Sequence, residues 1–133
     1  MFTPEIITSL APNEVFVFGS NLAGRHGAGA AKTAFKAFGA HWGQGIGFSE
    51  QSYAIPTKNH FLETLPLQFI CPHVGEFLDF AASRLDLRFF VTPVGCGLAG
   101  YTPKDTAPLF LEGPCAPTSN IVFPRSFYPH HQL

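Results

Sequence analysis

The stretch that most restricts how this chain can fold is segment 95–101, Gly-Cys-Gly-Leu-Ala-Gly-Tyr, which directly follows the apolar run 89–94. Such a run predicts a buried strand. Three glycines within six positions after a strand mark a backbone that turns tightly, or that approaches a ligand more closely than a Cβ would permit. The segment is therefore either a simple turn or part of a phosphate-binding loop.

A second unit of the same kind lies near the N-terminus. Residues 15–18, Val-Phe-Val-Phe, predict a central strand that ends at Gly-Ser-Asn, residues 19–21. A glycine-rich segment, 24–29, comes next, and apolar residues then recur with helical spacing up to Gly39, the expected stop. A strand, a glycine loop and a helix in this order direct the helix N–H groups and its positive dipole end toward whatever lies above the strand.

The remaining chain continues the alternation, with a strand expected over 52–56, a helix over about 73–85, a short helix from 102 and a last strand over 121–124. Residues 43–47 are expected to be loop, and Pro66 and Pro72 to bracket an irregular approach to the second helix. This order predicts an α/β fold: a single domain over residues 1–128 with a mainly parallel mixed sheet flanked by helices. Residues 129–133 are expected to be a flexible tail.

Composition narrows the class of protein. The 133 residues suffice for one domain with a real core, since 46% are hydrophobic and 15 are Phe. Eight Lys and Arg against nine Asp and Glu leave no basic excess to hold a nucleic-acid backbone. Three widely spaced cysteines predict neither a disulfide framework nor a metal site, and no cofactor is expected. We expect a cytoplasmic protein without a membrane partner, because no apolar run approaches the roughly 20 residues of a membrane span.

Ligands of parallel sheets bind beyond the carboxyl ends of the strands. Three stretches rich in glycine or polar residues each follow an expected strand, namely 21–29, 57–58 and 95–101. A parallel arrangement brings all three to one rim. Two loops rich in N–H groups and the ammonium of Lys58 would suit a dianionic group such as a diphosphate, with no metal required.

Residues 5–8, 15–21 and 27–31 resemble the opening of macro domains, the α/β modules that bind ADP-ribose. The closest resemblance is to the branch with terminal ADP-ribose protein glycohydrolase and the DNA ADP-ribosyl glycohydrolase antitoxins. There a Thr-Lys pair ends a strand, as residues 57–58 do here, and the second loop begins Gly-Cys-Gly, as residues 95–97 do. The chain is also similar to small proteins of phages and prophages, so a bacterial or phage-encoded cytoplasmic protein is expected.

The resemblance implies that the chain binds ADP-ribose or an ADP-ribosylated substrate and hydrolyses an ADP-ribosyl linkage. Lys58 and Asn21 would be the catalytic residues, with Asn21 in contact with the distal ribose. The ligand-binding residues implied are Glu5, Ser20, Asn21, Gly24, Gly27, Ala28, Gly29, Thr57, Gly95, Cys96, Gly97, Leu98, Ala99, Gly100 and Tyr101. Glu5 stands where the family has an Asp that reads the adenine amino group. Ala99 stands where the glycohydrolase has an Asp, an acid that the antitoxin branch also lacks.

Plainer interpretations stand beside these. Lys58 is equally explained as a counter-charge or a solvated lysine, and Cys96 is better explained as a small buried residue than as a nucleophile. His26 is expected to be an exposed loop histidine, Tyr101 to pack and Asp105 to cap a helix. For the whole chain, a non-catalytic module that sequesters an ADP-ribose-type nucleotide, and a phage structural or interaction protein, both remain open.

Overall fold

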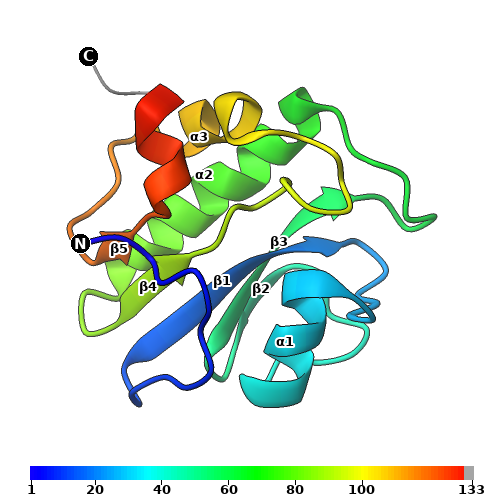
Figure 1. The fold of residues 1–133 in the computed structure, drawn as a ribbon, viewed down its shortest axis with the longest axis horizontal. Coiled ribbons are helices and arrows are strands. Elements are labelled where there is room, and N and C mark those ends of the chain that lie inside the picture. The colour runs from blue at the N-terminus through cyan, green and yellow to red at the C-terminus, as the bar shows by residue number, and fades with distance from the viewer. Residues whose placement is uncertain (131–133) are drawn as a thin grey trace.

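The computed structural model describes residues 1–130, which form a five-stranded sheet in the order β2-β3-β1-β4-β5 (Figure 1). The strands are β1 (Glu14–Asn21), β2 (Gly47–Ser49), β3 (Ser52–Lys58), β4 (Arg88–Val91) and β5 (Ile121–Val122). β1 pairs in parallel with β3 and β4, and β4 with β5, whereas β2 runs antiparallel to β3 at one edge. The prediction of an α/β fold with a mainly parallel mixed sheet is confirmed.

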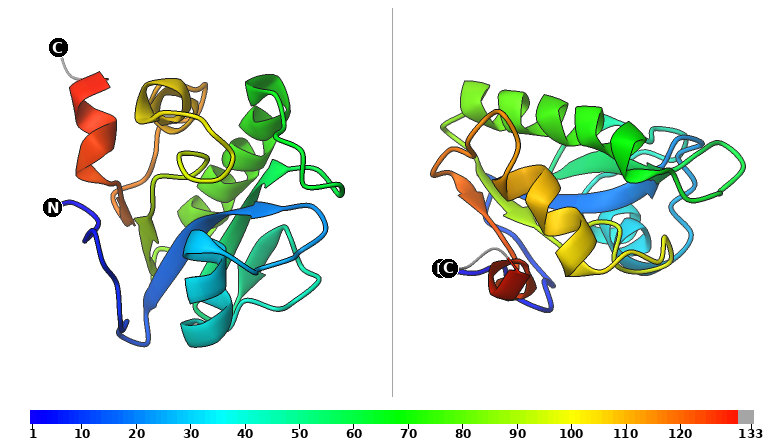
Figure 2. Two further views of the ribbon diagram at one scale, coloured as in Figure 1. Left: turned by 45° about the vertical axis from the view of Figure 1, so that its right-hand side comes forward. Right: turned by 90° about the horizontal axis from the view of Figure 1, so that it is seen from above.

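Helices cover both faces of this sheet: α1 (Gly29–Ala37) lies on one face, and α2 (Leu67–Ser83) and α3 (Pro103–Leu111) pack on the other (Figures 1 and 2). The 3-10 helix η1 (Arg125–His130) closes the chain beside the N-terminal segment, where Thr3 pairs with Pro124. No helix within residues 1–130 combines the length and the apolar character needed to cross a membrane. The predicted tail begins inside η1, and residues 131–133 lie outside the described part of the chain.

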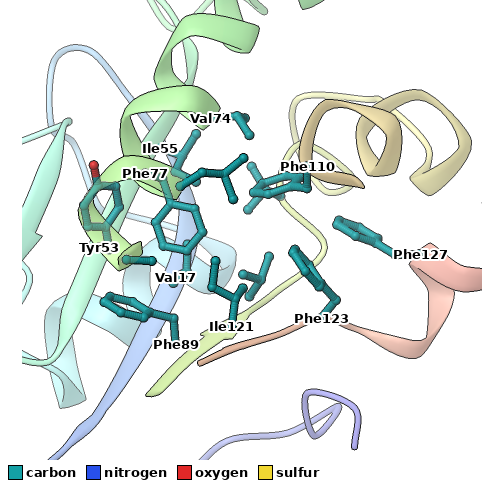
Figure 3. Close-up of a cluster of buried hydrophobic side chains, with 14 of the residues drawn as sticks. Val17, Tyr53, Ile55, Val74, Phe77, Phe89, Phe110, Ile121, Phe123 and Phe127 are labelled. Carbon is teal, nitrogen blue, oxygen red and sulfur yellow. The ribbon is translucent and has the colours of Figure 1, made fainter. Parts of the chain in front are cut away.

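The alternation of side chains along β1 builds two cores. Val15 and Val17 belong to the larger core, which combines aromatic rings from β3, β4, α2, α3 and η1 with aliphatic side chains (Figure 3). Phe16 and Phe18 point the other way, toward α1. Burial of one such ring stabilises the fold by about 1.5–3 kcal/mol. Because both faces of β1 are covered, the open region beyond its carboxyl end is where a ligand can approach its backbone.

Two predicted boundaries are wrong. α2 begins at Leu67 rather than near residue 73, and Pro72 lies inside it. Pro72 lacks the N–H that a helix residue at this position would donate to the preceding turn, and the helix forms despite this loss because Ile70, which is 1% exposed, anchors its first turns in the core. Gly47, expected to be loop, begins the edge strand β2, whose three residues are too few to show a periodic pattern.

Candidate functional site

A cavity of about 600 Å³ opens at the carboxyl ends of the central strands, and we call it the first cavity. All three stretches that the sequence placed at one rim contribute to its walls. The predicted site residues that line it are Ser20, Asn21, Gly27, Ala28, Gly29, Thr57, Lys58, Gly95, Gly97, Leu98 and Ala99. The structure therefore brings together the two glycine-rich loops and the lysine.

The N-terminus of α1 forms one wall of the first cavity. Its N-cap, Ala28, makes no capping bond through its side chain, and no acidic residue lies in the first turn. Lys32 is the first residue of the helix whose N–H bonds back, to the Ala28 carbonyl at 3.2 Å. The N–H groups of residues 29–31 have no hydrogen-bond partner within residues 1–130. These open donors and the positive end of the helix dipole favour an anion at this wall.

The loop after β4 forms another wall of the first cavity. Gly95 has φ of +80° and starts a tight turn. Two backbone bonds close the loop, from Gly100 N–H to Gly97 O at 3.0 Å and from Tyr101 N–H to Gly95 O at 2.9 Å. Within this loop, the N–H groups of residues 97–99 have no hydrogen-bond partner in the described chain. Consecutive unpaired N–H groups in a turn are a common cradle for phosphate oxygens.

Two cations complete the walls. Lys58 is the last residue of β3 and is half-buried, and its ammonium has no hydrogen-bond or ion-pair partner within residues 1–130. Arg25 is exposed in the first glycine loop, and its guanidinium likewise has no partner there. No Asp or Glu of the described chain lines the first cavity. Positive groups therefore face no carboxylate in this cavity, which suits an anionic ligand.

Hydrogen bonds from three polar side chains, those of Asn21, Ser20 and Thr57, fix the backbone of the site. Asn21 accepts the Arg25 N–H through Oδ1 and donates Nδ2–H to the Arg25 carbonyl, both at 2.9 Å. Thr57 Oγ1 donates to the Ser20 carbonyl at 3.2 Å, and Ser20 Oγ donates to the Gly45 carbonyl. Asn21 thus fixes the first loop, and its amide keeps one N–H and one lone pair for a ligand.

A second cavity, also of about 600 Å³, lies beside the first. It is lined by the N-terminal segment, including Glu5, and by Ser126 of η1. Ala30, Thr92 and Pro93 line both cavities, so the two adjoin beside the first turn of α1. Glu5 therefore lines the second cavity, whereas Lys58 lines the first.

Four predicted site residues line neither cavity. Tyr101 packs against the larger core and donates its hydroxyl to the Leu65 carbonyl at 2.6 Å. Cys96 Sγ lies 3.4 Å from Thr106 Oγ1, and burial raises the pKa of this thiol, which disfavours the reactive thiolate. Gly24 and Gly100 have φ of +70° and +89°, which favour glycine, and they lie in the turns of the first glycine loop and of the loop after β4. A ligand-binding role for these four residues stays a prediction.

His26 differs from expectation, because it is 1% exposed rather than on the surface. Its Nε2 lies 2.9 Å from the His41 carbonyl and 3.0 Å from that of Gln44.

Sequence reasoning also missed part of the cavity lining, namely Gly19, Arg25, Ala30, Ala31, Trp42, Leu62, Thr92 and Pro93. For Arg25 a signal existed, since a cation inside a glycine-rich loop is a candidate anion ligand. Trp42 and Leu62 belong to separate connecting segments without such a signal.

Comparison of the chain with protein-family models, with curated proteins and with solved structures gives no match. Across residues 1–130, no group of three or more His, Cys, Asp or Glu side chains is placed to hold a metal ion. What the site does is therefore inferred from its geometry and charges.

Proposed function

We propose that this chain binds ADP-ribose, or a related NAD-derived nucleotide, with the diphosphate between the N-terminus of α1 and residues 97–99. One observation carries the proposal: the unpaired N–H groups of both loops and the ammonium of Lys58 share a cavity without a carboxylate. A diphosphate supplies two negative charges and several acceptor oxygens for these donors. The resemblance of the glycine loops to those of macro domains supports the same assignment.

The two adjoining cavities suit the two halves of such a ligand. The adenosine half would occupy the second cavity, where Glu5 would accept a hydrogen bond from the adenine amino group. The distal ribose would lie in the first cavity beside Asn21 and Lys58. Each cavity has the volume of an ordinary small-molecule site. A ligand shorter than ADP-ribose, such as AMP, would leave the Lys58 end empty.

With an ADP-ribosylated substrate, Lys58 would cleave the bond to the distal ribose. The lone pair of the neutral amine would form a bond to the anomeric carbon while the bond to the leaving group breaks. The electron pair departs with that group, which takes, through water, the proton that the newly bonded Lys58 nitrogen releases. Water then adds to the anomeric carbon as the bond from that carbon to the Lys58 nitrogen breaks; the nitrogen takes the proton of the water, which gives free ADP-ribose and the free amine.

A non-catalytic binding module is the second candidate. The observation that favours it is the absence of a carboxylate from the described lining of the first cavity, so that no side-chain carboxylic acid there can protonate a leaving group. Such a module would sequester the nucleotide, with Lys58 acting only as a counter-charge. Both candidates predict binding of free ADP-ribose, and only the first predicts turnover.

Two variants of Lys58 separate the enzyme from the binding module: Lys58→Ala, and Lys58→Arg, which keeps a cation but has no neutral amine. Lys36→Ala is the control, because it removes an exposed lysine from the last turn of α1. For an enzyme, both Lys58 variants lose at least about 100-fold of turnover on ADP-ribosylated peptides or oligonucleotides. Lys58→Arg still binds ADP-ribose, and Lys36→Ala behaves as wild type. Wild-type binding without turnover on either substrate class would favour the sequestering module. Full turnover by Lys58→Ala would exclude the lysine mechanism.

A further inference from the structure

The connection between α1 and β2 carries the single tryptophan of the chain, Trp42. Trp42 lines the first cavity and is 56% exposed. Its ring meets Phe35 edge-on at 5.5 Å between centroids, and it lies 6.2 Å from the His26 ring. One side of the indole is therefore held by α1 and the first glycine loop, while much of the remainder is open at the cavity.

Loop 41–45 is tied closely to the first glycine loop. Gly43 N–H donates to the Gly24 carbonyl at 2.8 Å, and Ser20 Oγ donates to the Gly45 carbonyl. A Cβ at Gly45 would lie 2.0 Å from the Asn21 carbonyl oxygen, so these backbones pass too close for any side chain. The backbone that carries Trp42 is therefore held against the first glycine loop, which forms a wall of the cavity.

His26 adds the side-chain link that holds both ends of the turn in loop 41–45. Its Nε2 faces two carbonyl oxygens, those of His41 and Gln44, so this nitrogen carries the proton. Nδ1 is buried and has no hydrogen-bond partner in the described chain. The ring itself packs edge-on against Phe18 at 5.5 Å between centroids. His26 thus joins β1 to the carbonyls on either side of Trp42.

We propose that Trp42 is a specificity-determining residue that packs its indole against the distal ribose, and that His26 is the positioning residue that holds Trp42 there. The inference rests on the proposed function. Trp42 lines the cavity that contains Asn21 and Lys58, and it is absent from the lining of the cavity that contains Glu5. The C–H face of a sugar is apolar, and the half-exposed indole offers it a matching flat surface. ADP-ribose should therefore contact Trp42, whereas AMP should not.

Because Trp42 is the single tryptophan, its fluorescence reports this contact directly. ADP-ribose and AMP are titrated into the wild-type protein by fluorescence and by calorimetry in parallel. ADP-ribose should change the emission of Trp42 with the affinity measured by calorimetry, and AMP should leave the emission unchanged. Calorimetric binding of ADP-ribose without a change in emission overturns the Trp42 contact and leaves the proposed function standing. Absence of calorimetric binding overturns both.

Substitution of the indole gives a second test by calorimetry. Trp42→Ala should weaken ADP-ribose binding about tenfold and leave AMP binding unchanged, whereas Trp42→Phe should keep most of the affinity. Phe69→Ala is the matched control, because Phe69 on α2 is 55% exposed and lines neither cavity. Equal losses for ADP-ribose and AMP in Trp42→Ala would contradict a contact at the distal ribose.

The positioning role is tested at His26. His26→Gln keeps a donor near the place of Nε2, whereas His26→Asn is too short to reach either carbonyl and His26→Phe has no donor. We expect the Asn and Phe variants to shift Trp42 emission to the red and to weaken the binding of ADP-ribose more than the binding of AMP. The Gln variant should match the wild type in both emission and affinity. If His26→Phe does not fold, the comparison of Gln with Asn decides. Equal ADP-ribose affinity and equal emission in both would overturn the role of His26.

Discussion

Lys58 and Arg25 are the cationic side chains among the described residues that line the first cavity, and neither has a carboxylate partner there. In most proteins an ammonium that is half-buried is paired or reaches water with its end. Here the unpaired N–H groups of residues 29–31 and 97–99 line the same cavity, so several groups together create its positive potential. Binding of an anionic ligand should accordingly weaken as the salt concentration rises.

Gly27 offers a direct test of the cavity wall. It lines the first cavity, and a Cβ built on it meets no atom within 4 Å. Gly27→Val should therefore place its side chain in the space assigned to the diphosphate. We expect ADP-ribose affinity to fall at least about tenfold in calorimetry, and the melting temperature to stay close to that of wild type.

The control for Gly27→Val is Gly75→Ala, at a glycine inside α2 whose Cβ also meets nothing within 4 Å and which lines neither cavity. This change should stabilise the protein by about 0.5–1 kcal/mol through helix propensity and should leave binding unaltered. Unchanged affinity in Gly27→Val would show that the ligand does not lie along the α1 wall.

At the scale of elements, α3 fixes the end of the loop after β4. Thr102 N–H and Thr102 Oγ1 both donate to Asp105 Oδ2 at 3.0 Å, which forms the predicted capping box directly after Tyr101. The backbone hydrogen bond from Thr102 is the largest cause that lowers the pKa of Asp105 below its usual value. A carboxyl with a depressed pKa in the folded state stabilises the fold at neutral pH and loses this effect as pH falls through that pKa.

Asp105→Ala should thus lower the melting temperature at pH 7, and the difference from wild type should shrink as pH falls below about 4. Thermal unfolding of both proteins between pH 7 and pH 2 measures this. Asp79→Ala, which removes an exposed acid from α2, serves as the control and should change the melting temperature little. A difference between wild type and Asp105→Ala that stays constant over this pH range would exclude ionisation of Asp105 as the source of the capping effect.

Elements with strong local signals were predictable. The β-branched and aromatic run of β1, the helical spacing of α1 before Gly39 and the capping residues of α3 each specify their structure within a few neighbours. The start of α2 was not predictable, because burial of Ile70 in the tertiary core outweighs the local effect of Pro72. The edge strand β2 exists through its pairing with β3, which short-range patterns do not encode.

At the scale of the whole molecule, the convergence of the three stretches followed from the parallel topology alone, because carboxyl ends of parallel strands share an edge. The contributions of Trp42 and Leu62 did not follow, since their loops reach the cavity only through tertiary packing. The burial of His26 has the same origin, because its partners His41 and Gln44 lie in another connection. Topology thus locates the site, and packing decides which side chains complete it.

The larger core also sets the response of the fold to alkali. Tyr53 is 5% exposed and packs against Phe77 and Phe80. Burial, with a smaller contribution from the charge of Glu76, raises the pKa of Tyr53 to about 12. A raised pKa means that the neutral phenol stabilises the folded state below the ordinary tyrosine pKa of about 10, and that this stabilisation is lost as pH rises toward about 12.

Absorbance titration of tyrosinate should therefore show a late step near pH 12 in wild type. Tyr53→Phe should lack this step and should resist alkaline unfolding better than wild type. Titration of Tyr53 near pH 10 in the folded wild-type protein would contradict the burial of its phenol.

Calorimetric titration of free ADP-ribose into the wild-type protein, with AMP as the comparison ligand, decides whether the first cavity holds a nucleotide diphosphate. We predict micromolar binding of ADP-ribose that AMP does not match, because the diphosphate and distal ribose would meet the α1 N-terminus, residues 97–99 and Lys58. No heat at millimolar ADP-ribose would contradict the proposed function, and the cavities beside α1 would then hold another ligand or none.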